Sequence, residues 1–295
     1  MSRTRDTGKE SQKAPATTEE GDAMYRDIAA VQIHGDKAER VTHEVIVEVP
    51  FALFINGRHA MTAMMSPVQL EDFVTGYLYT EQIIKKIDEI ESIRIEKNRM
   101  SVITTNLFKV LGPKKTILSG CGGSTSYIDS EKLPKIKSNL SIPVQMIRDM
   151  TREGLESDLH VKTGGIHVVV LAGKEGIIAR AEDIGRHNAM DRVIGYGLRN
   201  GVDFSKTFVI CSGRISSEMA RKCLIAGIPI LISRGATTTL AIDIAKQTGL
   251  TVVAFARSLR MMIYTNPERI EGAVSLSKDI RRHDAQGPGH HPLPE

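Results

Sequence analysis

Four short, continuous apolar runs occur in the second half of the chain, and more polar stretches with helical spacing separate them. The runs are IHVVVLA, TFVICS, IPILIS and TVVAFA, at residues 166–172, 207–212, 228–233 and 251–256. Helical stretches are expected around residues 187–199, 216–226 and 237–248. Strands that are buried on both faces and alternate with helices are typical of a layered α/β domain.

The first half shows a different pattern, in which apolar and polar residues alternate. The sequence HEVIVEV at 43–49 is typical of a half-buried strand. Residues 51–65 predict a hairpin that turns at Asn56-Gly57, and residues 91–106 predict a second hairpin. This half is therefore expected to be rich in strands.

Two helices and one loop complete the expected elements. Ser66-Pro67 predicts a helix start, with Ser as the cap and Pro in the first turn, followed by the helical sequence LEDFVTGYLYTEQII. A second helix is expected near 143–156. Residues 118–130, LSGCGGSTSYIDS, are dense in Gly and Ser and are expected to form a loop.

These patterns divide the chain into four segments. Residues 1–40 are polar and predict a disordered arm, and residues 276–295 predict a disordered tail. Between them we expect a small strand-rich domain at 41–142, which carries the Gly-rich loop, and an α/β domain at 143–275. The histidines of the tail are interpreted as solvated rather than metal-binding: His283, His290 and His291.

Composition narrows the class of protein. Hydrophobic residues make up 41% of the 295 residues, which is enough for a buried core. No stretch reaches the ~20 apolar residues of a membrane helix, and residues 1–23 have no apolar core typical of a secretion signal. With three cysteines, a disulfide framework is not expected, and a reducing cytoplasm fits. Aromatic residues are only 4% and Trp is absent, so binding of nucleic acid is not expected.

Cys121 is the first candidate for chemistry. It lies between glycines in SGCGGS, where converging backbone amides would lower the pKa of the thiol and make it a nucleophile. The alternative is a small residue in a flexible loop. Cys211 falls in an apolar strand and Cys223 in a helix, so both are expected to be core residues.

The other candidates lie next to the predicted strands of the second half. Gly164, Gly165 and His167 open the first strand, in a pattern that is also typical of a simple turn. Glu182, Asp183, Arg186, His187, Asn188 and Asp191 crowd a junction before a helix, where helix capping by Asp183 or Asn188 is the alternative. Such junctions are where α/β folds place ligands.

Two further candidates lie in a segment with excess positive charge. Ser212, Gly213 and Arg214 join a strand to a helix, and Arg257 and Arg260 follow the last apolar run, where the alternative is a solvated loop. From 213 to 270 there are eight Lys or Arg and three Asp or Glu, an excess of five positive charges, whereas the whole chain carries +4. A small phosphorylated ligand is therefore expected there.

The same stretches resemble one protein family. TGGIHVVVL, EDIGRHNAMDRVIG, SGRISSEMARKCLIAGIP and LTVVAFARSLRMMIYTNPERI, together with EVPFALFING upstream, are similar to the FdhD family over about 41–270. The resemblance implies a cytidine-deaminase-like α/β/α sandwich joined to a smaller α/β roll, as a homodimer. It places the family's persulfide cysteine on Cys121. It also places the family's cofactor-binding stretch on Phe255, Ala256, Arg257, Ser258, Leu259 and Arg260.

The resemblance also implies a function. Members of this family are sulfur carriers of the sulfurtransferase type. They accept persulfide sulfur from a cysteine desulfurase and pass it to a molybdenum or tungsten bis-guanine-dinucleotide cofactor. The cofactor is then inserted into formate dehydrogenase, and GDP is expected to mimic its nucleotide part. With such a cofactor, the carboxylate of Asp183 or Asp191 is expected to read the donors of the guanine base.

One position departs from the family pattern and leaves an alternative open. Many members have a second cysteine in C-G-x-C-G, where this chain has Ser124. The alternative function is a chaperone that holds the cofactor without moving sulfur. A zinc deaminase is not expected, because the sequence has no C-x-x-C pair and Val169 stands where H-x-E needs Glu.

Overall fold

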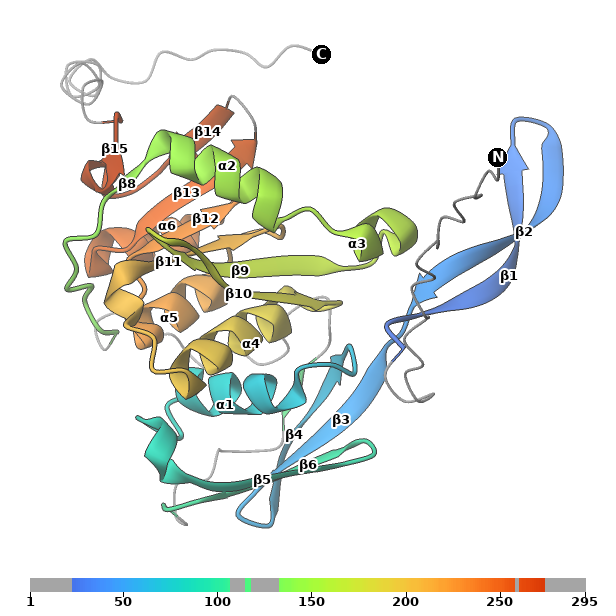
Figure 1. The fold of residues 1–295 in the computed structure, drawn as a ribbon, viewed down its shortest axis with the longest axis horizontal. Helices are drawn as coiled ribbons and strands as arrows, with labels where there is room; N and C mark the ends of the chain where they lie inside the picture. Colours follow the sequence, from blue (N-terminus) through green and yellow to red (C-terminus); the bar gives the residue numbers. More distant parts are fainter. Residues whose placement is uncertain (1–22, 107–114, 118–132, 258–259, 274–295) are drawn as a thin grey trace, which may run out of the picture.

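The protein is described by a computed structural model, in which residues 23–106, 115–117, 133–257 and 260–273 are placed. Its larger sheet has six strands in the order β10-β9-β11-β12-β13-β14 (Figure 1). The strands β11 to β13 run parallel, whereas β9, β10 and β14 make antiparallel pairs. The bounds are β9 His167–Gly173, β10 Gly176–Asp183, β11 Thr207–Cys211, β12 Ile230–Ser233, β13 Thr251–Arg257 and β14 Arg260–Ile263.

Helices cover both faces of this sheet. The helices α4 (Arg186–Arg199), α5 (Ser217–Ala226) and α6 (Thr239–Thr248) pack on one face, and α2 (Val144–Gly154) packs on the other. The predicted runs and helices of the second half all form near the expected residues, because each strand is buried on both faces. The mixed α/β class is thus confirmed, whereas the cytidine-deaminase likeness stays a prediction.

A second, five-stranded sheet has the order β5-β6-β3-β4-β7 and carries α1 (Leu70–Thr80) on one face. Both predicted hairpins form here. The first turns at Asn56 and Gly57, whose φ angles of 50° and 78° suit the tight turn of a two-residue hairpin. The strands are β3 Val49–Ile55, β4 Arg58–Met65, β5 Ile90–Glu96, β6 Arg99–Thr104 and β7 Lys115–Ile117.

The two halves meet where α1 crosses α4. A Cβ atom at Gly76 would lie 1.8 Å from the carbonyl oxygen of Asp191, and one at Gly195 would lie 1.9 Å from that of Asp72. Only glycine allows the two backbones to approach this closely. The joint between the two halves, at this crossing of α1 and α4, is therefore tightly packed. The predicted division into domains at residue 142 stays a prediction.

The start of α1 differs from the prediction. The helix begins at Leu70, after Gln69 in a left-handed conformation, and Ser66 does not cap it. Instead, the Ser66 backbone N–H donates to Asp183 Oδ2 at 3.0 Å, and its carbonyl accepts from Arg192 at 2.7 Å. These contacts, one from the end of β10 and one from α4, hold the chain at Ser66 and delay the start of the helix.

The predicted disordered arm is wrong for its last part, which forms an antiparallel hairpin of β1 (Tyr25–His34) and β2 (Lys37–Ile46). The hairpin projects from the body of the molecule (Figure 1), so its polar composition is compatible with strands that water reaches on both faces. The strands β10 and β14 were also missed. The remaining short elements are α3 Asp158–Thr163, β8 Ile142–Pro143, β15 Ile270–Glu271, and the 3-10 turns Ile87–Glu89, Phe204–Lys206 and Pro267–Arg269.

Among the placed residues, no helix has the length and apolar character that a membrane span needs.

Candidate functional site

One edge of the six-stranded sheet gathers the candidate stretches of the second half. Asp183 at the end of β10 lies opposite His167 at the start of β9. Next to them, Ser212 follows β11, Arg234 follows β12, and Arg257 ends β13. The parallel strands thus present their carboxyl ends here, as expected for a ligand-binding edge of an α/β sheet.

A cleft of about 600 Å³ opens at this edge, and we call it the glycine lobe. Gly164 ends α3 with a φ of 65°, and a Cβ atom at Gly165 would lie 2.9 Å from the Ile46 side chain. The backbone conformation at Gly164 and the close packing at Gly165 therefore both favour glycine, and both residues also form part of the cleft wall. The lobe is lined by Leu155, His160, Gly164, Gly165, Ile166, His167, Val168, Ser212, Arg234, Gly235 and Arg257.

A second cleft of about 600 Å³ adjoins the first, and we call it the α2 lobe. The two lobes share Arg234 and Arg257, so these two side chains lie between them. The α2 lobe is lined by Gln145, Ile147, Arg148, Asp149, Thr151, Arg152, Glu156, Arg234, Ala256, Arg257 and Met261.

The two shared arginines are exposed cations. In the part of the chain that is placed, no carboxylate oxygen lies within 4.0 Å of either guanidinium. Arg257 Nε donates to the Arg234 carbonyl oxygen at 3.4 Å, which ties the two loops together. Guanidinium groups of this kind bind phosphate through paired hydrogen bonds.

His167 lies at the inner wall of the glycine lobe. Its Nδ1 lies 3.4 Å from Ser212 Oγ, which accepts from the Val168 backbone N–H at 3.0 Å. Burial, with a smaller contribution from Arg186, lowers the pKa of His167. A Cβ atom at Gly213 would lie 3.0 Å from the imidazole, so the glycine of this turn makes room for the ring.

His187 joins the beginnings of α4 and α5. Its Nε2 lies 3.2 Å from both Ser216 Oγ and Glu218 Oε2. Burial, together with the positive charges of Arg186 and Lys222, lowers the pKa of His187 to about 3, despite the contact with Glu218. The neutral imidazole therefore serves as a fixed hydrogen-bonding link between the two helices.

The structure corrects the interpretation of the two aspartates. Asp183 is fully buried and pairs with Arg192 at 2.7 Å, while it also accepts from the Gly185 backbone and Asn188. Asp191 is buried and pairs with Lys222 at 2.7 Å. Neither carboxylate is accessible to a guanine base. Capping by Asp183 or Asn188 is also not what occurs, because Gly185 is the residue before α4 and no side chain caps the helix.

The remaining predicted residues divide into several groups. Cys121, Ser258 and Leu259 lie outside the described residues. Gly164, Gly165, His167, Ser212, Ala256 and Arg257 line the lobes. Arg186, His187, Asn188, Gly213, Arg214, Phe255 and Arg260 do not line them, although Arg214 and Arg260 are exposed close to this edge.

Sequence reasoning missed several lobe residues. Arg234 and Gly235 follow the buried run IPILIS, so the rule that selected Ser212 and Gly213 would have found them. The contribution of α2 had no such signal, because its place against β13 and β14 is a property of the fold.

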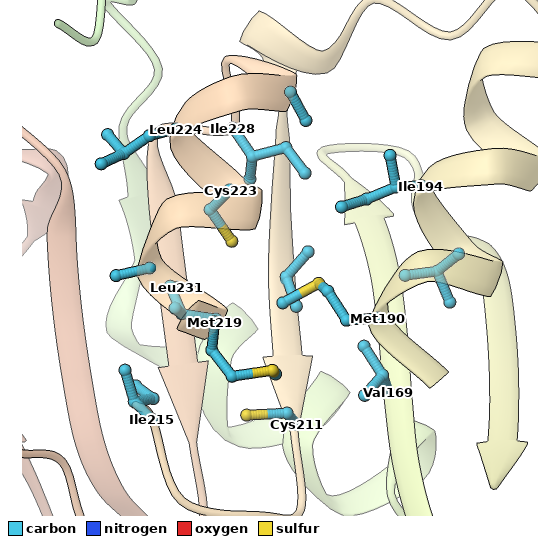
Figure 2. Close-up of a cluster of buried hydrophobic side chains, with 14 of the residues drawn as sticks. Val169, Met190, Ile194, Cys211, Ile215, Met219, Cys223, Leu224, Ile228 and Leu231 are labelled. Atoms are coloured by element: carbon cyan, nitrogen blue, oxygen red, sulfur yellow. The ribbon is translucent and has the colours of Figure 1, made fainter. Parts of the chain in front are cut away.

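Cys211 and Cys223 lie in the hydrophobic core, as predicted (Figure 2). Burial raises the pKa of Cys211 to about 12 and also raises the pKa of Cys223. Both thiols are thus protonated and enclosed by apolar side chains, which makes them unreactive. A cluster of three His, Cys, Asp or Glu that is able to hold a metal does not occur among the residues described.

Comparison with known proteins identifies a matching family and similar proteins. The model of the FdhD/NarQ family matches residues 46–271. The sulfur carrier protein FdhD of Wolinella succinogenes is 36% identical over 242 residues, 77% of this chain and 82% of that protein. The sulfur carrier protein FdhD of Staphylococcus aureus (strain JH9) is 32% identical over 261 residues, 84% of this chain and 98% of that protein.

A solved structure agrees with these sequence matches. The crystal structure of a putative formate dehydrogenase accessory protein from Desulfotalea psychrophila matches with a TM-score of 0.72 and 29% identity. The match covers 84% of this chain and 100% of that chain.

Proposed function

This chain belongs to the FdhD/NarQ family, and we propose that it is a sulfur carrier for formate dehydrogenase. Cys121 accepts persulfide sulfur from a cysteine desulfurase. The sulfur is then delivered to the molybdenum bis-guanine-dinucleotide cofactor before that cofactor enters the catalytic subunit of formate dehydrogenase. The names of the similar proteins support the carrier role.

The observation that carries the proposal is the arginine pair between the two lobes. The cofactor is the cargo of this protein, and its two guanine nucleotides carry diphosphate groups. Arg234 and Arg257 offer two exposed guanidinium groups at the ligand-binding edge of the sheet. A diphosphate that binds between them would make several charge-assisted hydrogen bonds, each worth about 1.5–3 kcal/mol. GDP is therefore a suitable probe.

The loading step requires only one thiol. The Cys121 thiolate attacks the outer sulfur of the desulfurase persulfide, a new S–S bond forms on Cys121, and the desulfurase cysteine leaves as a thiolate. No net oxidation or reduction occurs, because the sulfane sulfur moves between two thiols of the same oxidation level. The buried, protonated thiols of Cys211 and Cys223 are unsuited to this attack.

We further propose that the chain works as a cytoplasmic homodimer. Its partners are then a cysteine desulfurase, which supplies the sulfur, and the catalytic subunit of formate dehydrogenase, which receives the cofactor.

Mass spectrometry of the full chain tests the proposal. After incubation with a cysteine desulfurase and cysteine, the peptide that contains Cys121 should gain the mass of one sulfur atom. Cys121→Ala should show no such gain and should not activate a co-expressed formate dehydrogenase. Cys211→Ala and Cys223→Ala are the matched controls and should both load and activate. Normal activation by Cys121→Ala contradicts the persulfide mechanism.

Ser124 favours one alternative, a chaperone that binds the cofactor without carrying sulfur. A relay between two thiols of the Gly-rich loop is excluded by this serine. A one-thiol carrier should activate formate dehydrogenase equally with Ser124 and with Ser124→Cys, whereas a large gain in Ser124→Cys would show that the chain lacks a thiol that sulfur transfer needs. Binding of GDP with no persulfide on Cys121 would support the chaperone.

A further inference from the structure

The β1–β2 hairpin carries apolar side chains that remain exposed on both of its faces. The exposed large apolar residues of the hairpin are Tyr25, Ile28, Val31, Ile33 and Val45. Successive residues of a strand point to opposite faces, so Ile28 lies on one face of the hairpin, whereas Val31 and Ile33 lie on the other. Apolar surface that gathers on a projecting element is typical of a site of interaction with another protein.

The base of the hairpin is held against the body of the molecule, whereas the rest projects from it (Figure 1). Lys162 of α3 donates to Tyr25 Oη at 3.3 Å, and its ammonium group lies over the Tyr25 ring. Ile46 packs beside Gly165. A two-stranded hairpin is only marginally stable in water, so a further element that covers the projecting part would stabilise it.

The two outer edges of the hairpin differ in charge. Among the placed residues, the sheet has two strands only, and no third strand pairs with either edge. The strand β1 has no Asp, Glu, Lys or Arg at residues 28–33, and no bulge interrupts its register. In contrast, the charged residues of β2 are Lys37, Glu39, Arg40 and Glu44. Charges and bulges protect strand edges from other chains, so β1 is the edge that favours pairing.

The sequence of β1 is able to pair with itself across a two-fold axis. Such an interface uses the same surface on both subunits, which must therefore be complementary to itself. With the axis at Ala29, two antiparallel copies of β1 align without like charges opposite one another, an arrangement that would destabilise the pairing. The opposed residues are Tyr25 and Ile33, Arg26 and Gln32, Asp27 and Val31, and Ile28 and Ala30.

We propose that the β1 edge is the dimer interface of this protein, where the hairpins of two copies join into one four-stranded sheet. The order of strands in that sheet is β2-β1-β1-β2. Ile33, near the tip of one hairpin, then lies opposite Tyr25 of the second copy and close to Lys162 in its α3. This inference rests on the proposed function, because the homodimer is proposed there without an interface.

Cysteine cross-linking of the full chain tests the position of the axis. Cys121→Ala serves as the background, since Cys211 and Cys223 are buried. Ala29→Cys should form a disulfide between two chains under mild oxidation with diamide, because directly opposite residues of antiparallel strands have Cβ atoms about 4.5–5.5 Å apart.

Thr42→Cys is the matched control for this experiment. Thr42 lies opposite Ala29 within the hairpin and is also exposed. In the four-stranded sheet, however, three strand spacings separate the two copies of Thr42, about 14 Å. Thr42→Cys should therefore form no disulfide between chains.

Analytical ultracentrifugation of the full chain tests the interface by a second route. Ala29→Lys places two ammonium groups opposite each other at the axis, and the dissociation constant of the dimer should rise at least about tenfold. Thr42→Lys adds the same charge to the outer strand of the sheet and should keep the dissociation constant of the wild type.

The outcomes separate the interface from the proposed function. A wild-type dimer that Ala29→Lys leaves intact, or that Ala29→Cys does not cross-link, overturns the β1 interface while the homodimer stands. Cross-linking through Thr42→Cys also overturns it, because β2 would then lie at the axis. A wild-type chain that is monomeric at every concentration overturns both the interface and the homodimer, but leaves the sulfur carrier to be tested by the persulfide on Cys121.

Discussion

The charged residues at the joint between the two halves and those at the cleft have opposite surroundings. The pairs Asp183–Arg192 and Asp191–Lys222 are almost completely buried, with oxygen and nitrogen atoms 2.7 Å apart. At the cleft, Arg234 and Arg257 are exposed and have no carboxylate partner among the placed residues. Because an unpaired charge is costly inside a protein, each buried charge depends on its partner, while the exposed cations are available to a ligand.

This contrast changes the interpretation of EDIGRHNAMD, residues 182–191, from a binding site to a structural element. EDIGRHNAMD looks like a binding site, yet most of its polar side chains are buried and contact neighbouring elements. Asp183 and Arg192 hold the chain at Ser66, and Asp191 reaches Lys222 of α5 and Thr80 of α1. The stretch therefore acts mainly as a structural joint between the two halves, next to the edge that carries the two clefts.

The largest expected effect is on the buried pairs. Lys222→Met leaves Asp191 buried without its cation, and the free energy of unfolding should fall by about 3–5 kcal/mol. Lys206→Met is the control, because the Lys206–Asp203 pair is exposed, and its unfolding midpoint should stay close to that of the wild type. Urea unfolding of both variants checks this, and equal midpoints would show that the buried pair does not stabilise the joint.

The helix crossing should be the next most sensitive position. In Gly195→Ala, better helix propensity favours the folded state by about 1 kcal/mol, but the methyl group collides with the Asp72 backbone. Overpacking of this kind costs about 1–3 kcal/mol or more, so we expect a lower melting temperature. Gly173→Ala is the control, because its Cβ would have an ordinary contact at 3.4 Å. Similar melting temperatures for both variants would contradict the close crossing.

The cleft should respond in binding rather than in stability. Arg257→Ala should weaken GDP binding about tenfold to a hundredfold, since hydrogen bonds to charged groups contribute about 1.5–3 kcal/mol. Arg257→Lys should restore only part of the affinity, because an ammonium group lacks the planar pair of donors. Titration calorimetry measures the affinities and thermal unfolding checks the fold. A large loss of stability in Arg257→Ala would show that Arg257 stabilises the fold, as the buried pairs do, and would contradict a role in binding alone.

At neutral pH the smallest expected effect comes from His187, because its pH dependence develops only below pH 6.5. Its pKa is about 3 in the fold, below its ordinary value of 6.5, so between these values the unfolded chain binds more protons. Stability should therefore fall as pH is lowered through this window, by up to about 1.4 kcal/mol per pH unit from this residue. His187→Gln should remove that part of the slope. If stability falls with pH equally in the wild type and in His187→Gln, then His187 is as easily protonated in the folded chain as in the unfolded chain, which contradicts the prediction.

Four strands of the second half, β9, β11, β12 and β13, were predictable from sequence because each is buried on both faces. The strands β10 and β14 were missed, since they alternate between buried and exposed positions or are half exposed. The hairpin β1–β2 was not, because both of its faces are exposed and its composition resembles that of a flexible arm. The start of α1 was predicted three residues too early, since contacts from Asp183 and Arg192 outweigh the local preference of Ser66-Pro67.

The candidate site was predictable only where a ligand-binding residue follows a buried strand. That rule found Ser212 and Arg257, and it applies equally to Arg234. It also selected Asp183, whose surroundings depend on Arg192 nine residues later and on a loop from the other half of the chain. The residues that α2 contributes to the second cleft carry no sequence signal, because their place depends on how α2 packs on the sheet.

The most direct test of the account is one measurement on Arg234→Ala/Arg257→Ala. This double variant should be incubated with a cysteine desulfurase and cysteine, analysed for persulfide on Cys121, and titrated with GDP in parallel. We predict normal persulfide loading and loss of GDP binding, since loading depends on Cys121 and cofactor binding on the arginine pair. GDP binding at the wild-type affinity would contradict the account, and the two arginines would then be solvated surface residues.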